Sequence, residues 1–243
     1  MRSFYLDSSD WPELPDERLS LTGAEAHHAS RVVRVQPGEE VRVFDGLGRE
    51  ALAAVEYVGK NRVDLAPVEI RVVQPSARPV TLAVAWTKAL RRSWLLEKAV
   101  ELEASAIWFW QADRSQGRIP DEPKETWTGQ LVAGAKQCES AWIPELRTFP
   151  KGLAEVAAAA ASIPGRYILW EDPQQPRMLT AQDLAASEPM LFVLGPEGGF
   201  SPKEEALFTA EGSGFVPVSL GRRILRWETA ALLCLGLAFW SGS

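Results

Sequence analysis

Short runs of alternating apolar and polar residues dominate the first 73 residues of the chain. Turn-forming segments with the sequences QPGE, GLG and GKN separate these runs. A period of two between tight turns is typical of short antiparallel strands, because successive side chains of a strand point to opposite faces. We therefore predict a small β-barrel or meander, with strands at residues 31–35, 39–46, 51–59 and 62–73.

Residues 74–79, with the sequence QPSARP, end this pattern, and we interpret them as a linker. From residue 80 onward, apolar runs of strand length alternate with segments of helical period. The predicted strands are 80–86, 106–112, 166–171, 190–195 and 214–221, and the predicted helices are 91–104, 124–141, 153–162, one after the 190–195 strand and one from near Trp227. This alternation predicts an α/β domain with a mainly parallel sheet, which binds ligands beyond the carboxyl ends of its strands.

Composition narrows the class of protein. The 243 residues are 46% hydrophobic and 24% charged, as in ordinary soluble globular proteins. The apolar run from Ala230 is too short to span a bilayer, and acidic residues and prolines near the start argue against a signal peptide. We therefore expect a cytoplasmic protein with no membrane association. Core packing is the expected role of Trp86, Trp94, Trp108 and Trp110.

The cysteines and histidines do not suggest a metal site. Cys138 and Cys234 are far apart, without a CxxC motif or a nearby histidine, so we expect no metal and interpret both as small core residues. His27 and His28 are adjacent and have no partner at a ligand spacing, so surface positions are expected for both.

The formal net charge of -6 argues mildly against nucleic acid binding, which rests largely on neutralising phosphates. A local basic strip can nevertheless bind RNA within an acidic protein. If the 31–35 and 39–46 runs are strands, Arg31, Arg34, Arg42 and Arg49 can share one basic face.

A glycine-rich segment, LGPEGGFSPKEE at residues 194–205, follows the predicted strand 190–195. Its glycines permit conformations and close approaches that a side chain forbids. Ser201, Pro202 and Glu204 form the signature of a capped helix start. The segment is neither a Walker loop nor a GxGxxG fingerprint. It fits either a cradle for a small polar ligand or a tight turn whose glycines serve geometry alone.

Three arginines crowd a second segment, SLGRRILRWETAAL at residues 219–232. Arg222, Arg223 and Arg226 can hold a phosphate or stabilise charge that develops on a substrate oxygen, or they can form a solvated face. Ile224 and Leu225 favour the first interpretation, because two consecutive branched apolar residues suggest that the loop packs into a pocket.

Together, these two segments resemble the C-terminal signature of the ribosomal RNA small subunit methyltransferase E family. Members are uridine N3-methyltransferases of 16S ribosomal RNA within the knotted SPOUT class. The resemblance extends over essentially the whole chain, through segments 27–46, 86–104, 113–115 and 135–146. It implies a PUA-like RNA-binding β-barrel at 1–73, a linker at 74–79 and a SPOUT methyltransferase domain with a trefoil knot at 80–243.

The resemblance also implies S-adenosylmethionine (SAM) as the cofactor, bound in the knot. The residues expected to bind it are Leu194, Gly195, Pro196, Glu197, Gly198, Gly199, Ser219, Leu220, Gly221, Ile224, Leu225 and Thr229. It further implies a homodimer with the final helix, 228–240, in the interface. The expected partner is the 16S ribosomal RNA of the small ribosomal subunit.

The implied reaction is direct methyl transfer to N3 of a specific uridine. Arg226 is expected to stabilise negative charge on the uracil oxygens, and either Glu197 or Glu228 to orient an arginine or accept a proton. The expected RNA-binding residues are Arg31, Arg34, Lys88, Arg91, Arg114, Arg222 and Arg223.

Several residues depart from the family pattern. Glu103 stands where glycine is usual, Lys136 replaces an acid, Ser140 replaces an arginine, and Trp142 is near a commonly basic position. These departures leave two alternatives open. One is an enzyme of the same fold that acts on another RNA, and the other is a noncatalytic RNA-binding or assembly protein.

Overall fold

The computed structural model describes residues 1–13, 17–87, 92–171, 177–185 and 188–242. The chain divides into two compact units. The first unit contains Met1–Pro75 together with Val132–Ile143, and the second contains Ser76–Leu131 together with Pro144–Ser243.

The first unit is built on a five-stranded sheet with the order β1-β3-β4-β5-β2. β1 pairs parallel with β3, and the other pairs are antiparallel. The strands are β1 (Ser3–Tyr5), β2 (Leu19–Thr22), β3 (Glu40–Phe44), β4 (Arg49–Val58) and β5 (Arg62–Val72). Three of the four predicted strands are therefore present, because alternate side chains of β3, β4 and β5 enter one buried cluster.

The strand predicted at residues 31–35 is wrong, because this segment is helical. A short helix, α1 (Gly23–His27), continues into a π-helical turn, η2 (His28–Val33), which ends at Arg34 with a φ of 56°. Ala26 and Ala29 are completely buried, and their spacing of three residues is that of a helix face. Burial of these two alanines thus overrides the local alternation of RVVRV.

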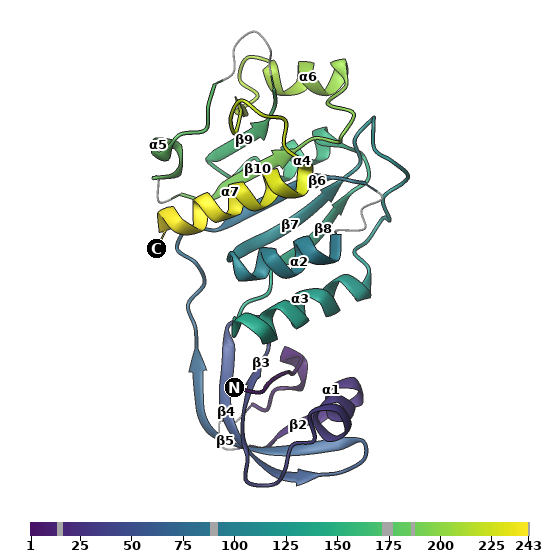
Figure 1. Ribbon diagram of the computed structural model, residues 1–243, viewed down its shortest axis with the longest axis vertical. Helices are drawn as coiled ribbons and strands as arrows, with labels where there is room; N and C mark the ends of the chain where they lie inside the picture. The colour runs from purple at the N-terminus through teal and green to yellow at the C-terminus, as the bar shows by residue number, and fades with distance from the viewer. Residues whose placement is uncertain (14–16, 88–91, 172–176, 186–187, 243) are drawn as a thin grey trace. The chain divides into compact units, whose positions relative to one another are not determined.

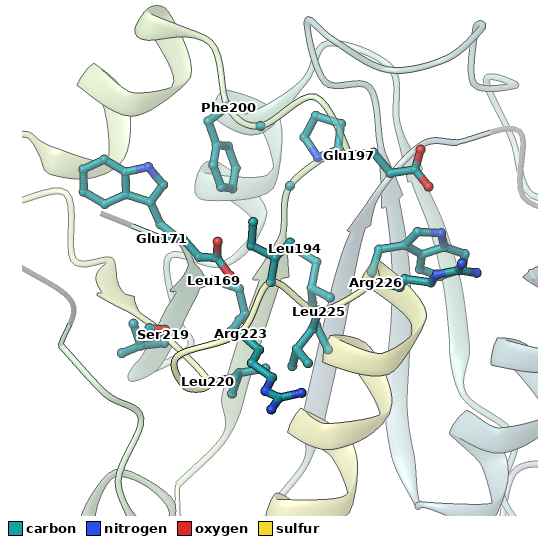
Figure 2. A pocket seen from close by; sticks show the side chains of 18 of the residues that line it. Leu169, Glu171, Leu194, Glu197, Phe200, Ser219, Leu220, Arg223, Leu225 and Arg226 are labelled. Carbon is teal, nitrogen blue, oxygen red and sulfur yellow. The ribbon is translucent and has the colours of Figure 1, made fainter. Parts of the chain in front are cut away.

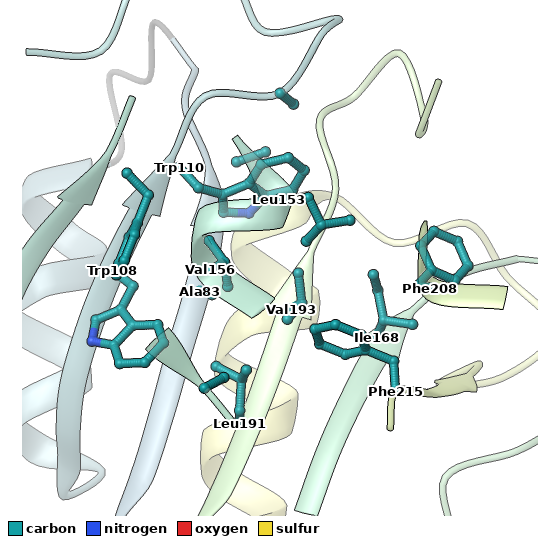
Figure 3. Close-up of a cluster of buried hydrophobic side chains, with 14 of the residues drawn as sticks. Ala83, Trp108, Trp110, Leu153, Val156, Ile168, Leu191, Val193, Phe208 and Phe215 are labelled. Carbon is teal, nitrogen blue, oxygen red and sulfur yellow. The ribbon is translucent and has the colours of Figure 1, made fainter. Parts of the chain in front are cut away.

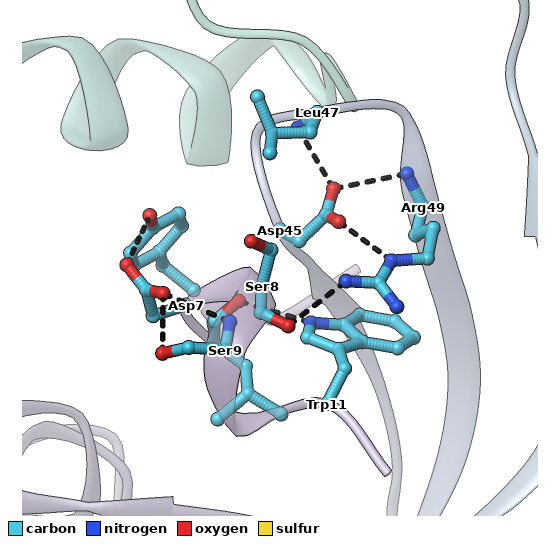
Figure 4. Close-up of polar contacts among 9 residues, drawn as sticks. Asp7, Ser8, Ser9, Trp11, Asp45, Leu47 and Arg49 are labelled. Atoms are coloured by element: carbon cyan, nitrogen blue, oxygen red, sulfur yellow. Dashed lines mark hydrogen bonds and ion pairs between the residues drawn. The ribbon is translucent and has the colours of Figure 1, made fainter. Parts of the chain in front are cut away.

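The predicted basic face of four arginines does not form. Arg42 is only 5% exposed and donates to Glu50 over 2.8 Å. Arg49 donates through Nε to the buried carboxylate of Asp45 (2.8 Å) and through Nη2 to the carbonyl of Ser8 (3.0 Å) (Figure 4). Both guanidiniums therefore stabilise the sheet and its turn, whereas Arg31 and Arg34 are exposed at η2.

Three departures from the family pattern make contacts within the first unit. Lys136 donates to Glu25 over 2.5 Å, and the Ser140 hydroxyl donates to the carbonyl of Trp142. The indole of Trp142 donates to the carbonyl of Val73 (3.1 Å). Lys136 and Trp142 thereby connect the segment from residue 132 to residue 143 to α1 and to the residue that follows β5.

The second unit contains a six-stranded, wholly parallel sheet with the order β11-β9-β10-β6-β7-β8. Its strands are β6 (Val80–Ala85), β7 (Ala104–Trp110), β8 (Glu145–Phe149), β9 (Gly165–Leu169), β10 (Met190–Leu194) and β11 (Val216–Val218). The prediction of an α/β domain with a mainly parallel sheet is confirmed. β8 was not predicted, because this edge strand alternates charged and apolar residues only briefly.

Helices lie on the faces of this sheet (Figure 1). α2 (Arg92–Glu101) contacts β7, α4 (Leu153–Ala159) contacts β8, α6 (Pro202–Thr209) contacts β11, and α7 (Trp227–Gly242) contacts β6 and β10. α5 (Ala181–Leu184) contacts α7, and α3 (Glu125–Cys138) begins in the second unit and ends in the first. After β11 at one edge, the chain returns to the centre of the sheet, where α7 contacts β6, β10 and α2. The expected knot requires such a return.

One face of the six-stranded sheet carries a continuous apolar core beneath α4 and α6 (Figure 3). Trp108 and Trp110 are buried in it and Trp86 is also buried, as predicted, but Trp94 is 43% exposed, contrary to the prediction. Cys234 is buried as expected, whereas Cys138 is exposed.

No described helix is both long enough and apolar enough to cross a membrane. No cluster of three or more potential metal-ligating side chains occurs within the described residues.

Candidate active site at the ends of three strands

A cavity of about 570 Å³ lies at the carboxyl ends of β9, β10 and β11 (Figure 2). Strand register creates it, because Leu169 pairs with both Leu194 and Val218, so the three strands end at the same level. The loops that follow the strands then meet. The lining residues are Arg114, Leu169, Trp170, Glu171, Leu194, Gly195, Pro196, Glu197, Gly199, Phe200, Glu205, Val218, Ser219, Leu220, Arg223, Ile224, Leu225, Arg226, Trp227 and Ala230.

The loop after β10 needs glycine at two positions. A Cβ atom on Gly195 would lie 2.8 Å from the ring of Phe200, which stacks on Trp110 at a centroid distance of 6.2 Å. Gly199 has a φ of +73°, a conformation that favours glycine. The loop ends in the predicted capping box, in which Ser201 and Glu204 each satisfy a backbone amide of the other at the start of α6.

The segment after β7 holds this loop in place. The backbone amide of Asp113 donates to the buried carboxylate of Glu204 (2.9 Å), and the Ser201 hydroxyl donates to Asp113. Arg114 donates through Nη1 to the carbonyl of Gly198 (2.9 Å). These hydrogen bonds connect the ends of two strands and give the wall of the cavity a defined shape.

The loop after β11 forms the opposite wall. The Ser219 hydroxyl donates to the carbonyl of Gly221 (3.0 Å), and Gly221 has a φ of +141°. Ile224 is 87% exposed although it lines the cavity, so an apolar edge is open to a ligand. Arg226 immediately precedes α7, and its carbonyl accepts a hydrogen bond from the amide of Ala230 (3.0 Å).

The structure brings most of the predicted site residues to this one cavity. Those that line it are Leu194, Gly195, Pro196, Glu197, Gly199, Ser219, Leu220, Ile224, Leu225 and Arg226, with Arg114 and Arg223 from the predicted RNA-binding set. Those that do not are Gly198, Gly221, Arg222, Glu228 and Thr229. Glu228 is buried in the first turn of α7. Lys88 and Arg91 lie outside the described residues, and Arg31 and Arg34 belong to the first unit.

Sequence reasoning missed part of the lining. The missed residues are Leu169, Trp170, Glu171, Phe200, Glu205, Val218, Trp227 and Ala230. A signal for three of them was available, because residues 169–171 end a predicted strand and ligands of parallel sheets bind at such ends. The segment was overlooked because it contains no glycine or arginine.

Apolar side chains line the cavity together with charged side chains of both signs. Its basic side chains are Arg114, Arg223 and Arg226, and its acidic ones are Glu171, Glu197 and Glu205. Glu197 accepts a long hydrogen bond, 3.5 Å, from Gln116. Such a site suits a small molecule with an apolar ring, polar substituents and charges of both signs.

Comparisons with known proteins agree with this geometry. A family model described as an RNA methyltransferase domain matches residues 74–238, and one described as an RNA methyltransferase PUA domain matches residues 21–68. Ribosomal RNA small subunit methyltransferase E of Mycobacterium bovis is 33% identical, over 96% of this chain and 89% of that protein. The Synechocystis protein of the same name is 28% identical, over 92% and 73% of the two chains.

A solved structure shows the same fold with a ligand. A Legionella pneumophila protein, determined in complex with the bound cofactor SAM, is 28% identical and superposes with a TM-score of 0.83. The match covers 99% of this chain and 97% of that one. With a PUA-like first unit and a methyltransferase second unit, the chain belongs to the ribosomal RNA small subunit methyltransferase E family.

Proposed function

We propose that this protein transfers a methyl group from SAM to N3 of a specific uridine in the 16S ribosomal RNA of the small ribosomal subunit. Membership of the family supports the class of reaction. The single observation that carries the proposal for this chain is the cavity between the β10 and β11 loops, which has Arg226 at its edge. N3 of uridine is the position that the sequence resemblance implies.

The residues of the cavity fit SAM. Its volume of about 570 Å³ is within the range of roughly 300–1,000 Å³ that is usual for small-molecule sites. Leu194, Leu220 and Leu225 offer an apolar surface to an adenine ring. Gly199 is exposed and carries no side chain that would separate a ligand from the loop backbone. The proposed cofactor-binding set is Leu194, Gly195, Pro196, Gly199, Ser219, Leu220, Ile224 and Leu225, with Gly198, Gly221 and Thr229 in supporting positions.

When bound, SAM supplies an electrophilic methyl group. The protein must then present N3 of the uracil and favour loss of the N3 proton, which spreads negative charge onto the uracil oxygens. Arg226 is suited to stabilise that charge. Arg226 lies immediately before the N-terminus of α7, where a cation is electrostatically unfavourable for the helix. The stability of α7 therefore does not explain an arginine at this position. The helix N-terminus also attracts negative charge.

The two carboxylates proposed for the proton differ in position. Glu197 is exposed and lines the cavity, whereas Glu228 is buried and does not. We assign to Glu197 the role of accepting the proton or orienting Arg226. Glu228 is in the first turn of α7, where a negative charge is favourable, and its proposed role is to support the start of that helix.

The charge pattern of the first unit supports an RNA contact at Arg31 and Arg34. Most of its other basic side chains are neutralised by carboxylates: Arg2 by Glu39, Arg18 by Glu56, Arg42 by Glu50, Arg49 by Asp45, Arg62 by Asp64, Arg71 by Glu69 and Lys136 by Glu25. Arg31 and Arg34 are exposed and form no ion pair with any described residue. Their charge is therefore available to phosphates.

A homodimer through α7 is also part of the proposal. The support for it is that three large apolar side chains of α7 are exposed. They are Leu233, Phe239 and Trp240, and Trp240 is 78% exposed. Such a cluster of exposed large apolar side chains is typical of an interaction surface.

The test is methyl incorporation from labelled SAM into small ribosomal subunits purified from cells that lack this enzyme. Nucleoside mass spectrometry identifies the product. We expect one new N3-methyluridine in 16S ribosomal RNA. Incorporation into another RNA would contradict the assigned substrate, and SAM binding without incorporation into any RNA would contradict the assigned reaction.

A further inference from the structure

Glu171 occupies a position in the cavity that neither of the two loop motifs explains. It follows β9, the middle strand of the three that end at the cavity, since β9 lies between β10 and β11 in the sheet. Leu169 is level with Leu194 and Val218. Glu171, two residues further along, therefore extends beyond the ends of the strands between the two loops.

The neighbouring residue fixes the direction of this segment. The backbone amide of Trp170 donates to the carbonyl of Val218 (3.0 Å), and its indole packs edge-on against Phe208 at 5.3 Å. Trp170 is thus anchored to the apolar core. The carboxylate of Glu171 is directed toward Leu194 and the middle of the cavity (Figure 2).

The carboxylate of Glu171 has no hydrogen-bond or ion-pair partner within the described part of the chain. By contrast, Glu197 accepts from Gln116, and the buried Glu204 accepts two backbone amides. Glu171 is exposed to the cavity, and a carboxylate with no partner among the described residues is available to accept hydrogen bonds from a ligand.

We propose that Glu171 recognises the ribose of the cofactor by accepting hydrogen bonds from its two vicinal hydroxyl groups. This inference rests on the proposed SAM site and adds a specificity-determining residue to it. A carboxylate has two acceptor oxygens that can receive a pair of adjacent hydroxyls, and acidic side chains at strand ends bind ribose in this way in other parallel α/β folds. The contact favours a ribonucleoside over its deoxy analogues.

Calorimetric titration of Glu171→Ala tests the proposal with SAM, adenosine, 2′-deoxyadenosine and 3′-deoxyadenosine as probes. Hydrogen bonds to a charged group predict that the affinity for SAM and for adenosine falls by about 10-fold or more. The deoxy analogues should bind the wild-type protein more weakly than adenosine does. The Glu171→Ala substitution should weaken binding of the deoxy analogues little further, because these ligands already lack a hydroxyl that would donate to Glu171.

Two further variants keep the result interpretable. Glu171→Gln retains one acceptor oxygen, and we expect an intermediate affinity for adenosine. Glu211→Ala removes an exposed carboxylate that does not line the cavity, so it reproduces the charge change and should leave adenosine affinity unchanged. Equal melting temperatures of the variants exclude a general loss of folding.

Three outcomes would overturn the proposal. If Glu171→Ala lowers the affinity for SAM but not for neutral adenosine, the carboxylate interacts with the positive charge of SAM and not with the ribose. If the deoxy analogues bind more weakly than adenosine by the same factor in Glu171→Ala as in the wild type, a group other than Glu171 contacts the hydroxyls. If neither SAM nor adenosine binds the wild-type protein, the proposed cofactor site itself fails, and the inference fails with it.

Discussion

Phe200 folds back over Gly195 so closely that a methyl group at Gly195 would lie 2.8 Å from its ring. The ring cannot simply retreat, because it stacks on Trp110 and packs edge-on against Phe208 at 5.1 Å. The width of the β10 loop is thus set by the core beneath it. This contact links packing in the sheet to the shape of the cavity.

We therefore expect Gly195→Ala to displace either Phe200 or the loop and to lower SAM affinity by 10-fold or more. Calorimetry measures the affinity, and a melting curve measures the accompanying loss of stability. The matched control is Gly129→Ala in α3, where an added Cβ meets nothing within 4 Å and alanine favours the helix. Equal affinities for SAM in the two variants would show that the loop tolerates the methyl group.

Replacing Arg226 should affect turnover more than cofactor affinity, because its proposed role is to stabilise charge in the transition state. We expect Arg226→Ala to lower kcat by roughly 100-fold or more, as loss of a comparable charge-stabilising donor does. Single-turnover methylation and SAM calorimetry separate the two effects. Lys203→Ala, on exposed α6 surface outside the cavity, serves as the control for charge. Wild-type turnover in Arg226→Ala would remove Arg226 from the mechanism.

RNA affinity should respond to Arg31 and Arg34, which form no ion pair with any residue that the structure describes. The double variant Arg31→Ala/Arg34→Ala should bind RNA more weakly, and the slope of log affinity against log salt should fall by roughly 1 to 2. Arg62→Ala/Arg71→Ala has the same change in net charge but removes arginines that already pair with Asp64 and Glu69. Filter binding across a salt series compares them. Identical slopes for the two double variants would place RNA docking elsewhere.

Glu103 adopts a backbone conformation that favours glycine, with a φ of 55° just after α2. A residue with a Cβ atom is strained in this left-handed region. We expect Glu103→Gly to raise the free energy of unfolding by up to about 1 kcal/mol. Urea denaturation measures the change. The same substitution at Glu97, in the interior of α2, should instead destabilise the protein by about 1 kcal/mol. Destabilisation of both variants would mean that interactions of the Glu103 side chain stabilise the protein by more than the strained backbone at Glu103 destabilises it.

The two cysteines should react at different rates with iodoacetamide. Cys138 is exposed, whereas Cys234 is buried in α7, and burial raises the pKa of the Cys234 thiol and so suppresses the reactive thiolate. Peptide mass spectrometry of the native protein should find modification at Cys138 first. Rapid labelling of Cys234 in the folded protein would show that α7 opens readily.

Local sequence was sufficient where the interactions that form a structure are themselves local. The start of α6 is an example, since Ser201, Pro202 and Glu204 lie within four residues and form the predicted capping box. The parallel sheet was also predictable, because buried strands and helices have different periods along the chain. Sequence similarly predicted β3, β4 and β5 from their alternation.

Tertiary structure decided whatever depends on distant partners. Residues 31–33 are helical because Ala26 and Ala29 are buried against the sheet. Arg42 is not available to an RNA surface because its guanidinium is buried and donates to Glu50, which is two residues from its register partner Leu52 on β4. Glu171 and Phe200 reach the cavity only through the shared register of β9, β10 and β11. The sequence by itself determined most strands and helices of the second unit, the strands β3, β4 and β5, and the two loops, through short-range periodicity and capping. Pairing between strands far apart in the chain, which no local pattern encodes, decided which side chains meet.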